Sequence, residues 1–263
     1  MKNKLFTGQT LFYLREYFFP SGCGTCGEAL LNKEDAYFGF CEDCREQLST
    51  ALADGKRCEI CGKPLITEKE TCLSCREKGA VEAECYNEHI VKLNTVFPYT
   101  GKFLSVLEAY KFGKSLGAGN FLAQCLESSL QSLFTEKQSF PTPHSPFPIP
   151  HFEAAWVPVP PRPGKIKKQG WDQIEYLAKL LGKKRHLPVC RCLKRLPSRS
   201  QKELNQEERK TNLKGRILCT KKPPRTAILF DDVITTGATL NTCAAALLEN
   251  GTEKVYGICL FYD

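Results

Sequence analysis

Two adjacent carboxylates precede a run of hydroxyl side chains near the end of the sequence. Asp231 and Asp232 are followed by Thr235, Thr236, Gly237, Ala238 and Thr239. A loop of this kind binds a phosphate through backbone N–H groups and threonine hydroxyls, and its glycine lets the backbone approach the ligand closely. The two carboxylates would repel the same phosphate, so we expect them to face sugar hydroxyls or a bound Mg²⁺. The implied ligand carries a phosphate, a diol and a metal ion, as a ribose 5-phosphate with a pyrophosphate group does.

The residues on either side of this loop predict a strand before it and a helix after it. The apolar run 227–230 is typical of a buried strand, and the Ala- and Leu-rich segment 239–250 favours a helix that stops at Gly251. The loop then lies at a helix N-terminus, where backbone N–H groups and the helix dipole favour an anion. The alternative is a capped turn with carboxylates by chance. The ordered match of apolar run, acid pair and threonine-glycine turn favours the phosphate site.

The cysteines indicate a second kind of chemistry. The chain has 15 cysteines, and eight of them form four Cys-x-x-Cys pairs: Cys23 with Cys26, Cys41 with Cys44, Cys58 with Cys61, and Cys72 with Cys75. Two such pairs complete a tetrahedral zinc site, and four cysteines leave no open coordination position for catalysis. We therefore expect two structural zinc ions. The short intervening segments favour pairing the first pair with the second and the third with the fourth, and a cross-braced order is the alternative.

Other readings of these cysteines are disfavoured. An odd number of cysteines without a secretion signal argues against a disulfide framework. A thioredoxin-type role is disfavoured because no strand-helix context surrounds the pairs. Neither a signal peptide nor a long apolar span is visible, so we expect a cytoplasmic protein without a transmembrane segment. The apolar stretch 11–20 is interrupted by Arg15 and Glu16, which favours an amphipathic helix packed on the protein over a membrane-surface segment.

Charge is unevenly distributed along the chain. Residues 156–226 hold 20 Lys and Arg against 5 Asp and Glu, a net charge of +15, whereas the whole chain has +8. A segment this basic is either a solvated surface or a phosphate-binding region, and the segregation favours the second. We expect Arg162 and Lys165 to meet a pyrophosphate. The candidates for nucleic-acid binding are Lys167, Lys168, Lys194, Arg195, Arg199, Lys202, Arg209 and Lys210. Trp171 and Tyr176 are the nearest aromatic residues for base stacking.

Alternating strands and helices predict an α/β protein with a mostly parallel sheet flanked by helices. The expected strands lie at 92–101, 154–161, 217–220 and 254–261, and the expected helices at 102–115, 119–134 and 171–184. Ligands in such sheets bind beyond the carboxyl ends of the strands. We expect a helix and double zinc module at 1–85 and an α/β domain at 86–263, with a Pro-rich insertion at 139–152. The polar segment 193–217 is expected to be mobile and able to close over a ligand.

Three motifs together resemble one family. The stretch FDDVITTGATL at 230–240 resembles the phosphoribosyl pyrophosphate (PRPP) loop of type I phosphoribosyltransferases. With the paired-cysteine module, VPVPPRPGKIKKQGWDQ at 157–173 and SQKELNQEERKTNLKG at 200–215, the chain resembles the ComF family of competence proteins. Family members usually show Arg-Gly-Phe-Asn-Gln where this chain has Gln169-Gly170-Trp171-Asp172-Gln173.

The resemblance implies a fold, a site and partners. The fold would be type I phosphoribosyltransferase-like. Asp231 and Asp232 would hold the ribose hydroxyls at the catalytic centre, and residues 235–239 the 5′-phosphate of PRPP with its Mg²⁺. The family setting is natural transformation, in which single-stranded DNA is handled beside a DNA-translocating helicase and other competence proteins.

Three functions follow from these observations. One is binding of single-stranded DNA and a phosphoribosyl ligand. The second is active transfer of a phosphoribosyl group from PRPP to an unidentified nitrogen acceptor. The third, a zinc-stabilised scaffold that binds only proteins, is disfavoured by the intact phosphate loop.

Overall fold

Four parallel strands form the centre of the protein. The computed structural model describes residues 21–53, 57–59, 62–63, 65, 69–77, 89–134, 154–184, 187–197 and 216–262. The strands lie in the order β1 (Lys92–Pro98), β6 (Lys254–Tyr262), β5 (Thr226–Ile234) and β2 (Ala154–Pro158), and each pairs in parallel with its neighbour. Parallel strands need both faces covered, and β2 and β6 are accordingly apolar along most of their length.

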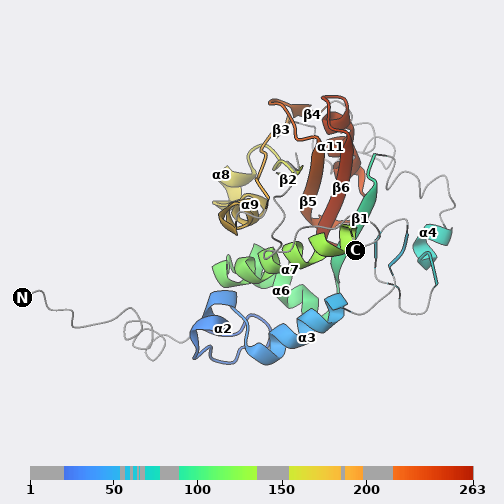
Figure 1. The fold of residues 1–263 in the computed structure, drawn as a ribbon. Coiled ribbons are helices and arrows are strands. Elements are labelled where there is room, and N and C mark those ends of the chain that lie inside the picture. Colours follow the sequence, from blue (N-terminus) through green and yellow to red (C-terminus); the bar gives the residue numbers. More distant parts are fainter. Residues whose placement is uncertain are drawn as a thin grey trace, which may run out of the picture.

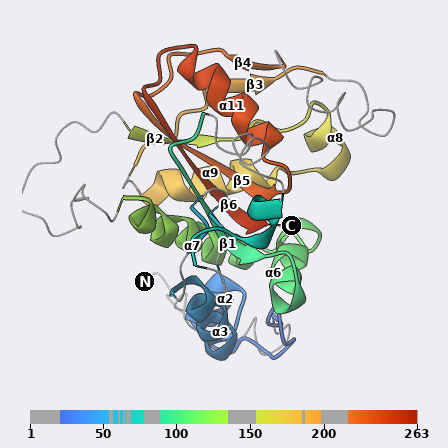
Figure 2. The ribbon, with the colours of Figure 1, turned by 90° about the vertical axis from the view of Figure 1, so that its right-hand side faces the viewer.

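Helices cover both faces of this sheet. Figure 2 shows the strands running diagonally between α11 (Ala238–Leu248) on one side and α7 (Leu116–Phe134) and α9 (Gln173–Lys184) on the other. Successive residues of a strand face opposite layers. On β2, Trp156 belongs to the α7–α9 core and Val157 to the α11 core; on β5, Phe230 and Leu229 do the same. The fold class predicted from the sequence, α/β with a parallel sheet flanked by helices, is confirmed.

Several elements differ from the predictions. The predicted helix 102–115 is α6 (Gly101–Lys111), which ends earlier because the chain turns at Lys114 with a φ of 51°. The basic loop after β2 contains a short helix, α8 (Lys165–Gln169), bounded by glycines in left-handed conformation. The predicted mobile segment 193–217 is ordered at both ends, where β3 (Leu193–Arg195) pairs antiparallel with β4 (Ile217–Cys219). These ends are held because Arg195 and Ile217 are buried.

The first cysteine segment packs directly on the α/β part. Figure 1 shows α2 (Lys33–Phe38) and α3 (Glu42–Ala53) beneath α6 and α7. Leu30, Phe40 and Leu48 are buried in the same hydrophobic core as α7. The expected boundary at residue 85 and the expected insertion at 139–152 both lie outside the described residues, as does the stretch 11–20. Within the described part of the chain, no helix has the length and apolarity needed to span a bilayer.

The second cysteine segment, which includes α4 (Leu73–Glu77), lies along the edge strand β1 (Figure 1). The Arg57 guanidinium donates to the carbonyl oxygens of Gly62 (3.0 Å) and Thr95, and the Thr95 hydroxyl also donates to Gly62 (3.1 Å). Side-chain hydrogen bonds therefore hold the segment around Gly62 against the edge of β1, which covers part of this sheet edge.

This close approach makes a testable prediction at Gly62. Its φ is +68°, and an added Cβ would lie 1.8 Å from the Leu93 carbonyl oxygen. We expect Gly62→Ala to lower the free energy of unfolding by at least about 2 kcal/mol, because strain and a backbone clash add together. Urea unfolding measures the loss. Gly27→Ala is the matched control, since Gly27 has φ +79° with nothing within 4 Å of an added Cβ. Equal losses in the two variants would contradict the clash.

Candidate functional site

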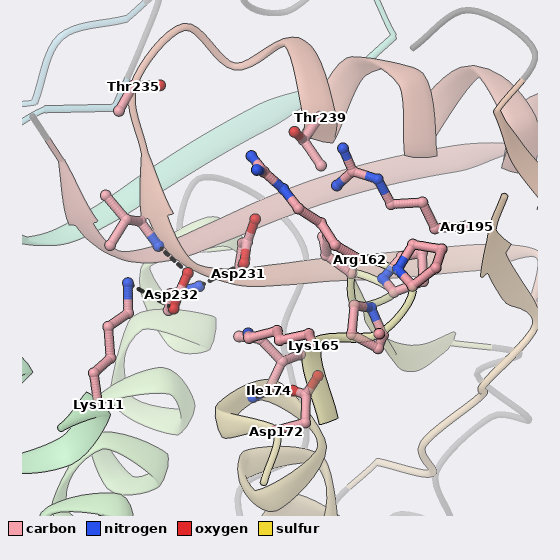
Figure 3. A pocket seen from close by; sticks show the side chains of 16 residues that line it. Lys111, Arg162, Lys165, Asp172, Ile174, Arg195, Asp231, Asp232, Thr235 and Thr239 are labelled. Carbon is pink, nitrogen blue, oxygen red and sulfur yellow. Dashed lines mark hydrogen bonds and ion pairs between the residues drawn. The ribbon is translucent and has the colours of Figure 1, made fainter. Parts of the chain in front are cut away.

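A cavity of about 560 Å³ opens at the carboxyl ends of β2 and β5. Five separate segments supply its walls: the end of α6, the loop and helix after β2, the start of α9, β3, and the end of β5 with the turn that follows. Figure 3 shows Asp231, Asp232 and Arg162 at its centre, with Thr235 farther out on the turn after β5. This is the place where ligands bind in open parallel sheets.

The acid pair lies on the last residues of β5. Asp231 accepts a hydrogen bond from the backbone N–H of Asp232, and Asp232 accepts one from that of Val233, each at 2.8 Å. The other oxygen of Asp232 lies 2.9 Å from the Lys111 Nζ at the end of α6. Burial raises the pKa of Asp231 well above its ordinary value; the neighbouring Asp232 raises it further, and Lys111 lowers it. A cation placed at this pair would offset the burial and the repulsion, because it favours the charged carboxylates.

The threonine-glycine turn joins this strand to α11. Gly237 adopts φ 71° and immediately precedes the first helical residue, Ala238. Gly237 has no side chain to cap the helix, and the backbone N–H of Ala238 donates a long hydrogen bond (3.5 Å) to the Thr236 hydroxyl. Thr235 and Thr239 line the cavity. The turn therefore presents a helix N-terminus with neighbouring hydroxyls to the pocket, an arrangement that favours an anion.

Two guanidinium groups lie close together beside the acid pair. Arg162 comes from the loop after β2 and Arg195 from β3, and both line the cavity (Figure 3). Arg195 is only 8% exposed, and its Nε has no hydrogen-bond partner among the described residues. Burial lowers the pKa of Arg195, and Arg162 lowers it further. Like charges held together in this way are stabilised by a bound polyanion, because an anion between them replaces repulsion by attraction.

The first cysteine cluster has the geometry of a zinc site. The sulfur atoms of Cys23, Cys26, Cys41 and Cys44 all lie within 4.8 Å of one another. The 3.8 Å between the Cys26 and Cys41 sulfurs equals the edge of a tetrahedron with Zn–S bonds of about 2.3 Å. Burial raises the pKa of Cys23, but backbone N–H groups of Cys26, Thr25 and Cys41 lower it more, to about 7. The residues present therefore fit Zn²⁺, which binds thiolates.

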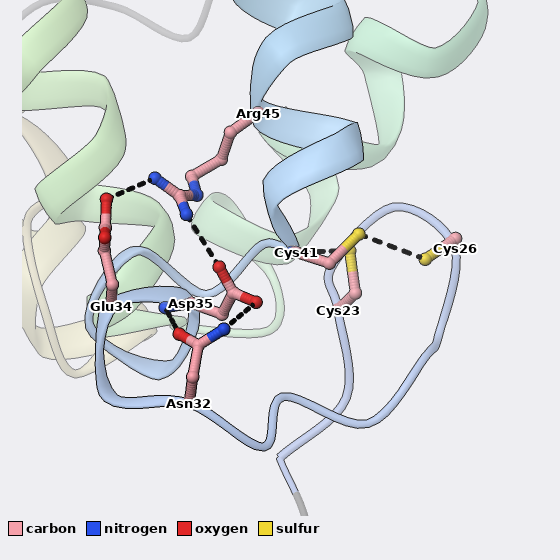
Figure 4. A network of polar contacts seen from close by, with 7 residues as sticks. All are labelled: Cys23, Cys26, Asn32, Glu34, Asp35, Cys41 and Arg45. Atoms are coloured by element: carbon pink, nitrogen blue, oxygen red, sulfur yellow. Dashed lines mark hydrogen bonds and ion pairs between the residues drawn. The ribbon is translucent and has the colours of Figure 1, made fainter.

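A polar network fixes the segment between the two pairs of this cluster. Figure 4 shows Arg45 of α3 paired with Glu34 (2.9 Å) and Asp35 (2.7 Å) of α2, while Asn32 caps α2 through Asp35. The backbone N–H of Cys41 donates to the sulfur of Cys23 at 3.4 Å. These contacts orient the second pair toward the first.

The second cluster contains the sulfur atoms of Cys58, Cys72 and Cys75, again within 4.8 Å of one another. Its remaining candidate ligand, Cys61, lies outside the described residues. Both clusters bring together consecutive pairs, which is the sequential order and not the cross-braced one.

Comparison with known proteins agrees with these features. The family described as "Double zinc ribbon domain" matches residues 14–76. Competence protein ComFC of Bacillus subtilis is 25% identical over 80% of this chain and 78% of its own length. Competence protein F of Haemophilus influenzae is 25% identical over 82% and 87%, and ComFC of Streptococcus pneumoniae 25% over 86% and 88%. The chain is a relative of the ComF competence proteins.

Most residues expected to meet the phosphoribosyl ligand surround one pocket in this ComF relative. Those that line it are Asp231, Asp232, Thr235, Thr239, Arg162 and Lys165. Thr236, Gly237 and Ala238 complete the turn behind them. Residues that are far apart in the sequence thus meet at the position that the strand-loop-helix pattern predicts.

The residues expected to bind nucleic acid are placed differently from one another. Lys167 on α8 and Lys194 on β3 are exposed, and Lys168 also belongs to α8. Arg195 faces the pocket. The remaining four, Arg199, Lys202, Arg209 and Lys210, lie outside the described residues. Trp171, expected to stack on bases, is only partly exposed and packs edge-on against Tyr110 with ring centroids 5.2 Å apart.

Sequence reasoning did not place three residues in the pocket: Lys111, Asp172, and Arg195, which was expected to bind nucleic acid. Lys111 reaches Asp232 from a helix that the sequence separates widely from β5, so no local motif signals the contact. Arg195 lies in a polar segment, and the sequence of such a segment predicts an exposed side chain. One feature of the sequence could have drawn attention to Asp172: it stands where the family usually has asparagine.

Proposed function

We propose that this ComF relative binds a phosphoribosyl ligand, such as PRPP with Mg²⁺, in the pocket, and single-stranded DNA on the adjoining basic surface. The observation that carries the proposal is the convergence of an acid pair, a helix N-terminus and two arginines on one cavity. A ligand with a diol and two separate anionic groups matches this set. The Mg²⁺ would neutralise charge between the pyrophosphate and the acid pair when bound.

Each group has a role in this proposal. Thr235, Thr239 and the first turn of α11 would bind the 5′-phosphate. Asp231 and Asp232 would accept hydrogen bonds from the ribose hydroxyls. Arg162, Lys165 and Arg195 would bind the pyrophosphate, the first two as expected from the sequence.

The DNA-binding part rests on charge and on the relatives. Residues 156–226 carry +15, and the exposed Lys167 and Lys194 lie on two elements that border the pocket. The three relatives are named as competence proteins. We infer that the chain acts in DNA uptake in the cytoplasm, with a DNA-translocating helicase and other competence proteins as its partners.

Fluorescence anisotropy of a labelled single-stranded oligonucleotide tests this function. Protein is titrated at several salt concentrations, with and without PRPP and Mg²⁺, and PRPP binding is measured separately by calorimetry. We expect DNA affinity that falls steeply with salt, because lysines and arginines release counterions from the phosphates. Absence of DNA binding at low salt would exclude the DNA part, and absence of heat with PRPP and Mg²⁺ would exclude the ligand part.

Active phosphoribosyl transfer is the second candidate function. The adjacent Arg162 and Arg195 suit a pyrophosphate leaving group, which would depart as a nitrogen nucleophile attacks the anomeric carbon of PRPP. Pyrophosphate release measured with a panel of nucleobases and amines decides it. Release with none of them would leave binding alone as the function of the pocket.

An exposed aromatic residue beside the pocket gives a specific prediction for DNA binding. Phe112 is 76% exposed and follows Lys111, which contacts Asp232. Lys114 follows on the same turn and is also exposed. Its Nζ lies near Gly170, where an added Cβ would be 3.6 Å from it. We expect Phe112→Ala to weaken single-strand affinity about 5- to 150-fold, since stacking of one base on an aromatic ring contributes about 1–3 kcal/mol.

The anisotropy assay provides the measurement, and two variants control it. Phe112→Trp keeps an aromatic face and should keep the affinity. Val91→Ala removes another well-exposed apolar side chain (63%) just before β1, at the amino ends of the strands and away from the pocket. If Phe112→Ala and Val91→Ala bind DNA alike, Phe112 does not stack on bases.

A further inference from the structure

The start of α9 forms a wall of the pocket and holds a buried oxygen without a donor. Asp172 lines the cavity and is only 7% exposed. Its Oδ1 accepts hydrogen bonds from the backbone N–H groups of Ile174 (2.8 Å) and Glu175 (3.1 Å), which caps the helix. Its Oδ2 receives no hydrogen bond from any residue that the structure describes.

The second oxygen is not needed for the helix. Serine and asparagine cap helices as well as aspartate does, and each does so with a single oxygen. A buried acceptor without a donor costs free energy, and buried polar atoms in proteins nearly always have a partner. A ligand that donates a hydrogen bond to Oδ2 from within the pocket would remove that cost.

The position of Asp172 indicates which part of a ligand would reach it. In Figure 3, Thr235 and Thr239 lie on one side of the acid pair, and Asp172 and Ile174 on the other. With a phosphate held at the threonine turn, ribose hydroxyls at Asp231 and Asp232 and a pyrophosphate at the arginines, the opposite face of the sugar's anomeric carbon, where a nucleotide carries its base, is left to face α9. The buried Ile174 offers an apolar contact there, which suits the ring of a base.

We propose that Asp172 is a specificity residue whose Oδ2 accepts a hydrogen bond from the exocyclic amino group of the ligand's base. This inference rests on the proposed phosphoribosyl site. A carboxylate accepts hydrogen bonds and does not donate them, so it favours a base with an exocyclic amino group over one with a carbonyl oxygen at the same place. The pocket thus selects amino-bearing ribose 5′-phosphates.

Two pairs of nucleotides test the inference, because the members of each pair differ only in the exocyclic group and in the hydrogen on the adjacent ring nitrogen. The affinities of adenosine and inosine 5′-monophosphate, and of cytidine and uridine 5′-monophosphate, are measured by calorimetry with Mg²⁺ on the full-length protein. We expect the amino-bearing member of at least one pair to bind roughly tenfold more tightly than its carbonyl counterpart.

Asp172→Asn is the decisive variant, because asparagine keeps the helix cap but can donate a hydrogen bond to a carbonyl oxygen. We expect it to abolish or reverse the preference while the thermal midpoint stays unchanged. Asp172→Ser keeps only the capping oxygen and should abolish the preference without reversing it.

The outcomes separate this inference from the function on which it rests. A protein that binds PRPP but none of the four nucleotides, or all four alike, overturns the specificity role alone. A preference that survives in Asp172→Asn also overturns it. A protein that binds neither PRPP nor any nucleotide overturns the phosphoribosyl site and the specificity role together.

Discussion

Replacing Cys23 and Cys26 with serine is expected to remove one zinc ion and to unfold the first cysteine segment together with much of the core that it covers. The four sulfur atoms of this cluster fit one tetrahedral ion. A structural zinc ion contributes about 10–16 kcal/mol to the folding of a small module, which is comparable to the roughly 5–15 kcal/mol of a whole domain. Loss of the ion therefore has a larger effect than any single packing change in the protein.

The packing explains why the damage would spread. Cys23, Phe40 and Leu48 belong to the same hydrophobic core as Phe97 of β1 and Leu122 of α7. Phe40 also contacts Phe121 edge-on, with ring centroids 5.3 Å apart. When the ligands of the first cluster no longer hold the segment in place, these buried side chains lose their cover.

Zinc content and thermal unfolding check this prediction. Elemental analysis of the intact protein should give two zinc ions per chain, and Cys23→Ser with Cys26→Ser should give one with a much lower midpoint. Cys190→Ser is the matched control, because Cys190 is a half-buried cysteine outside both clusters. Two retained zinc ions, or an unchanged midpoint, in the double variant would show that the first cluster is not a structural metal site.

Local patterns were sufficient to predict the central sheet but not its exact ends. The mostly apolar runs at 154–158 and 254–262 match the pattern of buried parallel strands, which are apolar on both faces, whereas the edge strand at 92–98 also contains Lys92, Asn94 and Thr95. β5 extends through Asp231 and Asp232 to Ile234, although a loop would suit these acids better by propensity. Pairing with β6 holds them in the strand, with Asp231 opposite Cys259. Tertiary pairing thus overrides the local preference at the residues that form the site.

Short elements and distant contacts were beyond sequence reasoning. β3 has three residues, too few for a period-two pattern, so Arg195 was not recognised as buried. α8 is a five-residue helix between Gly164 and Gly170, and its basic residues alone suggest a loop. The Lys111–Asp232 pair depends on how α6 packs, which no local sequence pattern specifies. The cysteine clusters were predicted from the sequence because tetrahedral zinc coordination requires a characteristic spacing of its ligands along the chain. Packing contacts have no such characteristic spacing.

Asp231→Asn is expected to weaken the binding of PRPP with Mg²⁺ at least about 100-fold. The carboxylate would bind both the ribose hydroxyls and the charge of the metal ion, and hydrogen bonds to a charged group contribute about 1.5–3 kcal/mol each. Asparagine keeps the oxygen that accepts from the Asp232 N–H (2.8 Å), so the local backbone should be preserved. The loss of affinity should therefore come from the missing charge.

The same substitution is expected not to lower the free energy of unfolding. Burial and the neighbouring Asp232 raise the pKa of Asp231 in the folded protein. A carboxyl group with a raised folded-state pKa contributes stability at low pH that is lost as the pH rises through that value, so above its unfolded-state pKa this carboxyl group destabilises the fold. Asparagine cannot ionise and so removes this destabilisation. The unfolding free energy of the variant should therefore equal or exceed that of the intact protein at neutral pH.

Calorimetry with PRPP and Mg²⁺, together with urea unfolding at neutral pH, distinguishes a binding residue from a structural one. Glu249→Gln removes an exposed carboxylate just after the last residue of α11, at the end opposite the pocket, and should change neither quantity. A variant that loses both affinity and stability would make Asp231 a structural residue. Lost affinity with retained or increased stability is the pattern of a site that keeps two carboxylates together for a ligand cation, at the expense of the unliganded fold.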